Sequence, residues 1–399
     1  MTTPFTRILL LVGLAALPLF AAAPAQAAKK MEVAIQDDGV FLYKKSYYDR
    51  EAAFRQAREL GVSRIRMNVL WSRVMTPAHA NAQDKPSAVA WEWSLYDSAV
   101  DRARAYGLKV QLALTGDPPR WACGRDLAPG DCDGYKPDVQ EFGEFAREAA
   151  EHFKGRVDRF SIWNEPNWHT WLSPLKQGPL IYRKLYQAGY KAIKGESKRI
   201  KVLMGELAPE AQKRIATAPL RFLREMVCVN KRFKKTKNAK KKCKGKMKLD
   251  GFAHHPYDFT VKPTKKPKRD NVTMANLDDL VDTLDRLQKK RLIQSKPKKT
   301  PIYLTEHGYY ASGSRARGEA KRKKWTVQAF NMAQKHPRVK TMLYYILVSP
   351  PPNDTSAFFD LGIVETDGTE TPTFKALKKW SKNAARDGKV AKPGRCSAC

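Results

Sequence analysis

The chain has 399 residues, and its 74 Lys and Arg against 40 Asp and Glu give a formal net charge of +34. This length suffices for one large domain or two ordinary ones, so burial of a core is not limiting, and no segment beyond the N-terminus is long and apolar enough to predict a transmembrane helix. The charge raises three kinds of partner: nucleic acid, an anionic membrane surface and an acidic polysaccharide.

The first predicted element is an N-terminal leader. Arg7 precedes an apolar run from Ile8 to Phe20, and an Ala-rich stretch then ends in Ala25-Gln26-Ala27. This order is typical of a signal peptide, and the apolar run falls short of the roughly 20 residues of a spanning helix. We therefore predict a signal peptide at residues 1–27, cleaved after Ala27, and a secreted protein that is extracellular or associated with the cell envelope.

Beyond the leader, short apolar runs of β type alternate eight times with amphipathic helical stretches. This alternation is expected of βα units around a parallel sheet. Strands are predicted at 31–36, 63–70, 109–114, 158–163, 200–205, 249–254, 301–305 and 340–347. Helices are predicted at 50–60, 94–106, 138–153, 179–195, 217–228, 275–291, 317–335 and 372–384.

Eight such units within about 350 residues favour a closed (β/α)8 barrel, the TIM barrel of the α/β class, over an open doubly wound sheet. No Gly-rich nucleotide fingerprint follows the first strand, and no sequence period recurs at fixed length as it would in a solenoid. We therefore predict one catalytic barrel over residues 28–385, a basic cysteine-containing C-terminal tail over 386–399, and a monomer.

The six cysteines fall in three local pairs. In an exported chain, an even number of cysteines favours disulfides over metal thiolates. We therefore predict three local disulfides, which join Cys123 to Cys132, Cys228 to Cys243 and Cys396 to Cys399.

Much of the positive charge lies in four runs, at 231–248, 262–269, 289–299 and 315–324. In a (β/α)8 barrel, loops that follow strands form the catalytic face and loops that follow helices form the opposite face. The first and third runs follow helices and are expected at that opposite face, whereas the other two are expected to rim the active site. Such runs are most often solvated loops. The functional interpretation is attachment to an acidic cell-envelope polymer, chiefly through the first run.

Two glutamates occupy matching places in the predicted barrel. Glu165 ends strand four in FSIWNEPNW, and Glu306 ends strand seven in IYLTEHGYY. Both positions belong to the catalytic face, on opposite sides of its mouth. A single Glu at a strand end is commonly a solvated residue, but the pair supplies what glycosidic cleavage requires: a carboxylic acid that protonates the leaving oxygen and a carboxylate that attacks the anomeric carbon.

The sequences around both glutamates resemble those of glycoside hydrolase clan A, as in families 5 and 39 with their cellulases, mannanases and xylosidases. The residues that carry the resemblance are Trp163-Asn164-Glu165-Pro166 and Leu304-Thr305-Glu306, and it extends over about residues 31–384. It implies a retaining glycosidase that acts on a carbohydrate without a cofactor. Glu165 would be the acid/base and Glu306 the nucleophile, with their carboxyl groups about 5 to 5.5 Å apart.

The same resemblance implies four further site residues. Arg66 corresponds to an arginine near the nucleophile, where it would lower the pKa of Glu306 and keep that carboxylate ionised. Asn164 corresponds to the asparagine that binds the sugar 2-hydroxyl. His255-Pro256-Tyr257 matches the clan's His-x-Tyr, so Tyr257 is expected to hydrogen-bond Glu306 and His255 to touch the sugar.

Aromatic residues crowd the predicted catalytic loops, where sugar rings pack on aromatic faces. Trp168 and Trp171, just after the acid/base, are the strongest candidates for sugar binding, and the others are Trp71, Trp121, Tyr309 and Tyr310. One departure from clan A is that strand eight carries no Trp at its end. Tyr345 is expected to replace that platform.

Other chemistries have weaker support. His254 and His255 lack an HExxH motif or a His-x-His carboxylate cluster, so no metal site is predicted, and His254 is assigned a structural role. His307, directly after the nucleophile, is expected to influence the pH optimum if it titrates. The alternative function is a non-catalytic or weakly catalytic binder of acidic envelope polysaccharide. Nucleic-acid binding rests on charge alone, and no specific nucleic acid is predicted as a partner.

Overall fold

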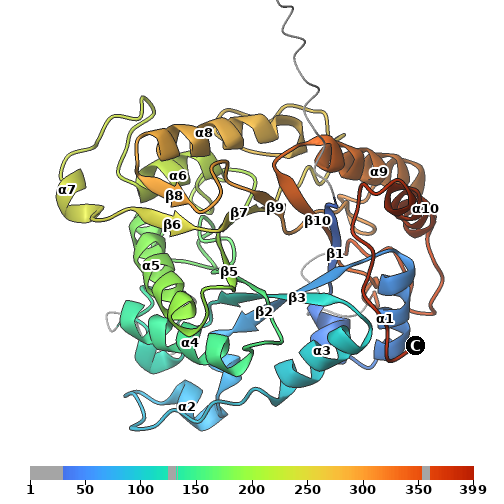
Figure 1. Ribbon diagram of the computed structural model, residues 1–399, viewed down its shortest axis with the longest axis horizontal. Coiled ribbons are helices and arrows are strands. Elements are labelled where there is room, and N and C mark those ends of the chain that lie inside the picture. The colour runs from blue at the N-terminus through green and yellow to red at the C-terminus, as the bar shows by residue number, and fades with distance from the viewer. Residues whose placement is uncertain (1–29, 125–131, 133, 353–359) are drawn as a thin grey trace, which may run out of the picture.

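The eight predicted apolar runs form the strands of a closed barrel in the computed structural model, which describes residues 30–124, 132, 134–352 and 360–399 (Figure 1). The strands are all parallel, in the cyclic order β1, β10, β9, β7, β5, β4, β3, β2. Their bounds are β1 (Glu32–Gln36), β2 (Arg64–Leu70), β3 (Lys109–Thr115), β4 (Arg159–Ile162), β5 (Lys201–Leu207), β7 (Gly251–His254), β9 (Ile302–Leu304) and β10 (Val339–Tyr345). The predicted TIM barrel is confirmed.

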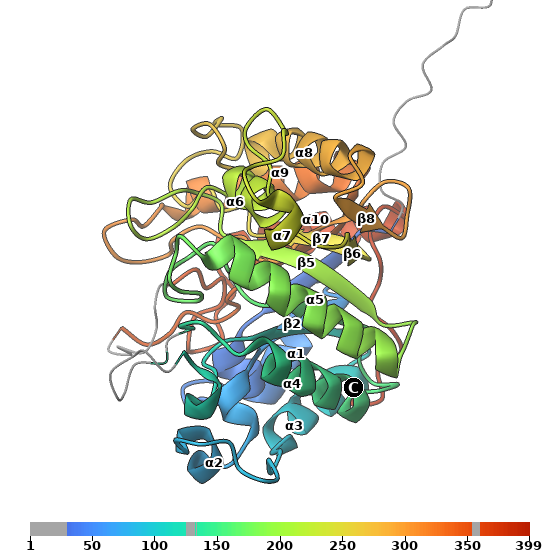
Figure 2. The same cartoon turned by 90° about the vertical axis from the view of Figure 1, so that its left-hand side faces the viewer.

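Helices surround the barrel on its outside, as Figures 1 and 2 show. The α-helices are α1 (Arg50–Glu59), α2 (Pro77–Asn81), α3 (Ser94–Ala105), α4 (Val139–His152), α5 (Gly178–Glu196), α6 (Pro219–Met226), α7 (Ala239–Lys242), α8 (Leu277–Lys289), α9 (Glu319–Lys335) and α10 (Pro372–Arg386). Short 3-10 or π turns are η1 (Asp38–Leu42), η2 (Trp71–Val74), η3 (Arg120–Ala122) and η4 (Met274–Asn276). All eight predicted helices are present, and none of the described helices is long and apolar enough to cross a membrane.

Helix α4 illustrates how the sequence pattern produces the packing. Asp138 caps its N-terminus by accepting hydrogen bonds from the backbone N–H groups of residues 140 and 141 at 2.8 and 3.0 Å. The helix buries Phe142 and Phe145 together with the small side chains of Ala146 and Ala149. Large and small apolar residues at helical spacing thus form one buried stripe, and the helix packs against α5.

The barrel interior is polar at the end opposite the catalytic face. Glu32 accepts hydrogen bonds from Arg64 at 2.9 Å, and its other oxygen lies 2.8 Å from a guanidinium nitrogen of Arg159. Burial acts to raise the pKa of Glu32, but the two arginines outweigh it and hold that pKa well below its ordinary value. This ion network fills the bottom of the barrel. Arg66, two residues after Arg64 in β2, takes no part in it and lies closer to the catalytic face.

One predicted strand, 249–254, is two elements. β6 (Met247–Leu249) ends before Asp250, and β7 then enters the barrel. β6 pairs instead with β8 (Ile293–Ser295) in a separate parallel two-stranded sheet. β8 lies within the charged run 289–299, where no strand was predicted because lysines flank its three residues.

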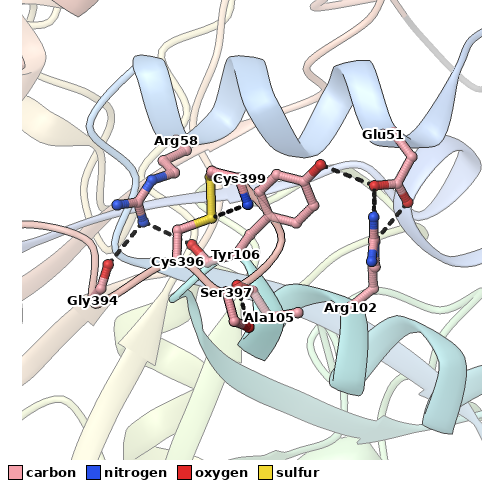
Figure 3. The surroundings of a disulfide bond; sticks show 9 residues. All are labelled: Glu51, Arg58, Arg102, Ala105, Tyr106, Gly394, Cys396, Ser397 and Cys399. Carbon is pink, nitrogen blue, oxygen red and sulfur yellow. Dashed lines mark hydrogen bonds and ion pairs between the residues drawn. A yellow bond between two sulfur atoms is a disulfide. The ribbon is translucent and has the colours of Figure 1, made fainter.

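The chain after α10 packs against the barrel. The backbone N–H of Gly394 donates to the Gly107 carbonyl at 2.7 Å. The backbone N–H of Ser397 donates to the Ala105 carbonyl at 2.8 Å, and Arg58 donates to the Gly394 carbonyl at 2.8 Å; Figure 3 shows these residues. Gly107 has a φ of 70°, and a Cβ there would lie 2.5 Å from the Gly394 oxygen, so only glycine fits this contact. The three predicted disulfides are all present, including Cys396–Cys399 in this segment.

Candidate active site

Glu165 stands three residues beyond the end of β4, in a backbone segment of unusual conformation. Trp163 and Glu165 have φ values of 68° and 38°, in the left-handed region that residues other than glycine rarely adopt. Two hydrogen bonds hold the segment: Asn164 N–H donates to the Thr115 hydroxyl at 2.9 Å, and Glu165 N–H donates to the Glu206 carbonyl at 2.9 Å. Such strain is typical of functional sites, where the surrounding structure fixes a side chain in one direction.

Glu306 follows β9 across the mouth of the barrel and is buried, with 8% of its side chain exposed. Arg66, from β2, donates to one carboxylate oxygen at 2.8 Å, and the Tyr257 hydroxyl donates to the other at 2.9 Å. Arg66 also donates to the Asn164 side-chain oxygen at 2.8 Å. Arg66 therefore links the two segments that carry the glutamates.

The two predicted catalytic carboxylates lie together. A carboxylate oxygen of Glu165, a ring nitrogen of His255 and a carboxylate oxygen of Glu306 are all within 4.8 Å of one another. Glu165 is the more accessible of the two glutamates, with 17% of its side chain exposed. Retaining glycosidases have their carboxyl groups about 5 to 5.5 Å apart, whereas inverting enzymes need about 6.5 to 9.5 Å to admit a water molecule.

His255 is fully buried and connects Glu165 to a third carboxylate. Its Nδ1 lies 2.9 Å from Glu165 Oε1, and its Nε2 lies 2.8 Å from Glu206 Oε2. Burial disfavours the charged imidazolium, but Glu306, Glu165 and Glu206 outweigh that effect and raise the pKa of His255 to about 9. His255 is therefore a cation at neutral pH that donates a hydrogen bond on each side.

Glu206, in β5, is a site residue that the sequence prediction missed. It is fully buried, has a φ of 50°, and accepts hydrogen bonds from Gln111 at 3.1 Å and from the Thr305 hydroxyl. Burial acts to raise its pKa, but Arg66 and His255 outweigh burial and lower the pKa of Glu206 to about 2. A signal was available, because Glu206 directly follows predicted strand 200–205 just as Glu306 follows strand 301–305.

The pKa of Glu306 differs from the sequence expectation. Burial raises it, the cations His255 and Arg66 lower it, and the negative charges of Glu165 and Glu206 raise it again. The net direction is upward. The expected effect of Arg66 is present, but the prediction of a lowered pKa is wrong because burial among other carboxylates is the stronger influence.

The predicted aromatic residues divide into exposed and buried sets. Trp168, Trp171 and Tyr345 are partly exposed, and Tyr345 lies close enough to Glu306 for that carboxylate to raise the pKa of its hydroxyl, with burial as the larger cause. Trp71 is fully buried and stacks on Phe145 with ring centroids 5.5 Å apart. Trp71 and the equally buried Tyr309 therefore belong to the core, and the interpretation of these two as sugar-binding residues is wrong.

The two remaining histidines of the site region are buried and neutral. His254 hydrogen-bonds the Val272 carbonyl at 3.0 Å, and burial lowers its pKa to about 3, which fits the structural role assigned to it. Burial likewise lowers the pKa of His307 to about 4. His307 does not titrate near neutral pH, so the expected influence on the pH optimum is absent.

Glu165, His255 and Glu306 form a cluster with the donor types and spacing of a metal site. His255, however, engages a carboxylate with each ring nitrogen, and with a pKa of about 9 it carries a proton on both. A protonated imidazole has no lone pair for a metal ion. The chemistry of the cluster therefore fits proton transfer better than metal binding.

Comparisons with known proteins agree with this fold. No family model matches the chain. A curated protein from Oryza sativa subsp. japonica, the chloroplastic beta-glucosidase-like SFR2, is 33% identical over 122 residues, which amount to 30% of this chain but only 18% of that relative.

Solved structures align over most of the chain. A family 39 glycoside hydrolase from Bacteroides cellulosilyticus WH2 aligns with a TM-score of 0.61 and 16% identity, over 88% of this chain and 64% of its own. A family 39 β-xylosidase from Caulobacter crescentus aligns with a TM-score of 0.57 and 17% identity, over 90% and 72%. At these identities the likeness shows the fold, which is the (β/α)8 barrel found in clan A glycoside hydrolases.

Proposed function

We propose that this protein is a retaining glycoside hydrolase that cleaves O-glycosidic bonds of an oligo- or polysaccharide by double displacement. The observation that carries the proposal is the approach of Glu165 and Glu306 to within 4.8 Å between one oxygen of each, from strand ends on opposite sides of the barrel mouth. An approach this close favours direct attack by one carboxylate over the water-mediated attack of inverting enzymes, whose carboxyl groups lie about 6.5 to 9.5 Å apart.

In the first step, Glu306 attacks the anomeric carbon while Glu165 gives its proton to the leaving oxygen, and a glycosyl–enzyme ester forms. Arg66 and Tyr257 direct the attack, since their hydrogen bonds fix both oxygens of Glu306. Asn164 accepts from Arg66 through its side-chain oxygen, which leaves its amide nitrogen to donate to a sugar hydroxyl. In the second step, Glu165 acts as a base and takes a proton from the water that hydrolyses the ester.

Buried charges of both signs surround the two glutamates. Arg66 and His255 are two buried cations, and Glu165, Glu206 and Glu306 are three carboxylates in contact with them. The low pKa of Glu206 keeps that carboxylate ionised, so Glu206 holds the two cations in place and is not a proton donor. His255 occupies Oε1 of Glu165, so Oε2 is the oxygen that remains available to the leaving group.

Glu206 is a positioning residue in this scheme. It does not reach the mouth of the barrel, but it fixes the His255 ring that orients Glu165, and its carbonyl oxygen accepts the Glu165 N–H. It also contributes to the upward shifts of the pKa of His255 and of Glu306.

The pH profile tests the role of Glu206. In Glu206→Gln, loss of one negative charge lowers the pKa of the Glu306 carboxyl, so the acid limb of the kcat/KM profile, which reports ionisation of the nucleophile, should move to lower pH by about one unit. Glu206→Asp keeps the charge and is the matched control, with a profile in its original position. An equal loss of kcat/KM at every pH in Glu206→Gln, without a shift, would show a purely structural role.

The first test of the activity itself is a screen of purified protein on chromogenic glycosides and polysaccharides. The double variant Glu165→Ala/Glu306→Ala is the control, because it keeps the barrel and removes both reacting groups. Hydrolysis by the native protein alone is the expected result. Equal hydrolysis by both proteins would assign the activity to a contaminant and contradict the proposal.

We further infer that the chain is exported. Residues 1–27 have the pattern of a signal peptide, and three disulfides without a free cysteine suit an oxidising compartment. The predicted signal peptide lies outside the described residues. N-terminal sequencing of protein recovered outside the cytoplasm should begin at residue 28, and an intact N-terminus on exported protein would contradict cleavage there.

A further inference from the structure

Two basic runs that are far apart in the sequence lie side by side. β6 belongs to run 231–248 and β8 to run 289–299, and their pairing matches Met247 with Ile293 and Leu249 with Ser295 (Figure 1). Neither run contains an Asp or Glu. The Cys228–Cys243 disulfide ties the first run back to the end of α6. The two-stranded sheet thus gathers positive charge on one side of the barrel.

A pocket of about 390 Å³ opens between α5 and the first of the two strands, β6, and we call it the basic pocket. α5 and β6 lie next to each other in both views (Figure 2). Its main lining residues are Tyr186, Tyr190, Lys191, Lys194, Lys246 and Lys248. Lys194 has a carboxylate partner, Asp250, whereas Lys191, Lys246 and Lys248 are exposed and pair with no carboxylate of the described chain.

We propose that the basic pocket binds a carboxylated sugar unit of an acidic polysaccharide. The volume is within the range of small-ligand pockets and holds a sugar ring. Three unpaired ammonium groups attract a carboxylate, and the half-buried ring of Tyr190 adds an apolar wall to the pocket, with the Lys194 ammonium 5.7 Å from its centroid over one face.

The lining favours a carboxylated glycan over a nucleic acid. All four cations are lysines, and the planar guanidinium fork that grips phosphate at two points is absent from the lining. Only one tyrosine ring of the pocket is partly exposed, whereas sites for single-stranded nucleic acid present several rings for successive bases.

The basic pocket is separate from the catalytic mouth. β6 immediately precedes barrel strand β7, and β8 precedes β9, so both lie at the N-terminal ends of the barrel strands. Glu165 and Glu306 follow the C-terminal ends of β4 and β9. A polymer held in the basic pocket is therefore an anchor for the protein and is not the bond under attack. This inference does not depend on the proposed hydrolysis.

Calorimetric titration with polygalacturonate tests the proposal. The triple variant Lys191→Gln/Lys246→Gln/Lys248→Gln should lose roughly tenfold or more in affinity and show a weaker dependence on salt. The matched control is Lys262→Gln/Lys265→Gln/Lys266→Gln, which removes the same charge from exposed lysines after β7. The control should change affinity less than about twofold, and the pocket variant should leave kcat/KM on a small neutral glycoside unchanged.

Three results would overturn the assignment. An equal loss in the control triple variant would mean that net charge alone attracts the polymer. Absence of polygalacturonate binding by the native protein would remove the site. If single-stranded DNA bound more tightly than a polygalacturonate chain with the same number of negative charges, the pocket would be assigned to nucleic acid. Dextran, a neutral polymer, should not bind in any case.

Discussion

Glu306→Gln should lower kcat by about 10⁴-fold or more on every substrate, because an amide cannot form the glycosyl–enzyme ester. Folding should be retained, since Gln has the same shape and its oxygen still accepts from Arg66 or Tyr257. Circular dichroism and the thermal midpoint check the fold, and steady-state kinetics check the activity. Wild-type turnover of the best substrate by this variant would refute the assignment of the nucleophile.

Glu165→Ala should show a loss that depends on the leaving group. Without the acid, kcat/KM on glycosides of poor leaving groups should fall by about 10³-fold, whereas dinitrophenyl glycosides, which need no protonation, should lose little in the first step. The intermediate then accumulates because no base activates water. Azide, a nucleophile that needs no base, should restore turnover and yield a glycosyl azide.

The azide product and the leaving-group series together identify the acid/base. Glu165→Gln is the matched control, because it keeps the hydrogen-bonding shape of the side chain while removing its proton transfer. It should behave like Glu165→Ala. A uniform loss across all leaving groups, without rescue by azide, would show that Glu165 only binds the substrate.

Much of the fold could be predicted from the sequence because the spacing of apolar residues indicates which side chains are buried. Each barrel strand appears as a short apolar run, and α4 shows its buried face in the spacing of Phe142, Phe145 and Ala149. The β6–β8 sheet could not be predicted, since strands of three residues within lysine runs carry no periodic signal. The packing of the last segment on Gly107 depends on contacts between distant residues, which local pattern does not encode.

The sequence predicted a site residue only where both the residue type and its position relative to a barrel strand could be recognised. Glu165, Glu306 and Tyr257 follow the ends of strands, Arg66 lies within β2, and the four come together as expected. The contact of His255 with Glu206 was not foreseen, because a sequence shows that a residue is charged but not which charges surround it. The raised pKa of Glu306 could not be predicted for the same reason, because it depends on burial and on the nearby charges of Glu165 and Glu206.

Retention of configuration is the central claim, and proton NMR of the first product tests it directly. Hydrolysis of a glycoside cleaved in the substrate screen should be followed from the first minutes, before mutarotation mixes the anomers. Double displacement through Glu306 predicts that the first anomer to appear has the configuration of the substrate. Initial appearance of the opposite anomer would mean a single displacement by water, with Glu306 as a base, and would contradict the account.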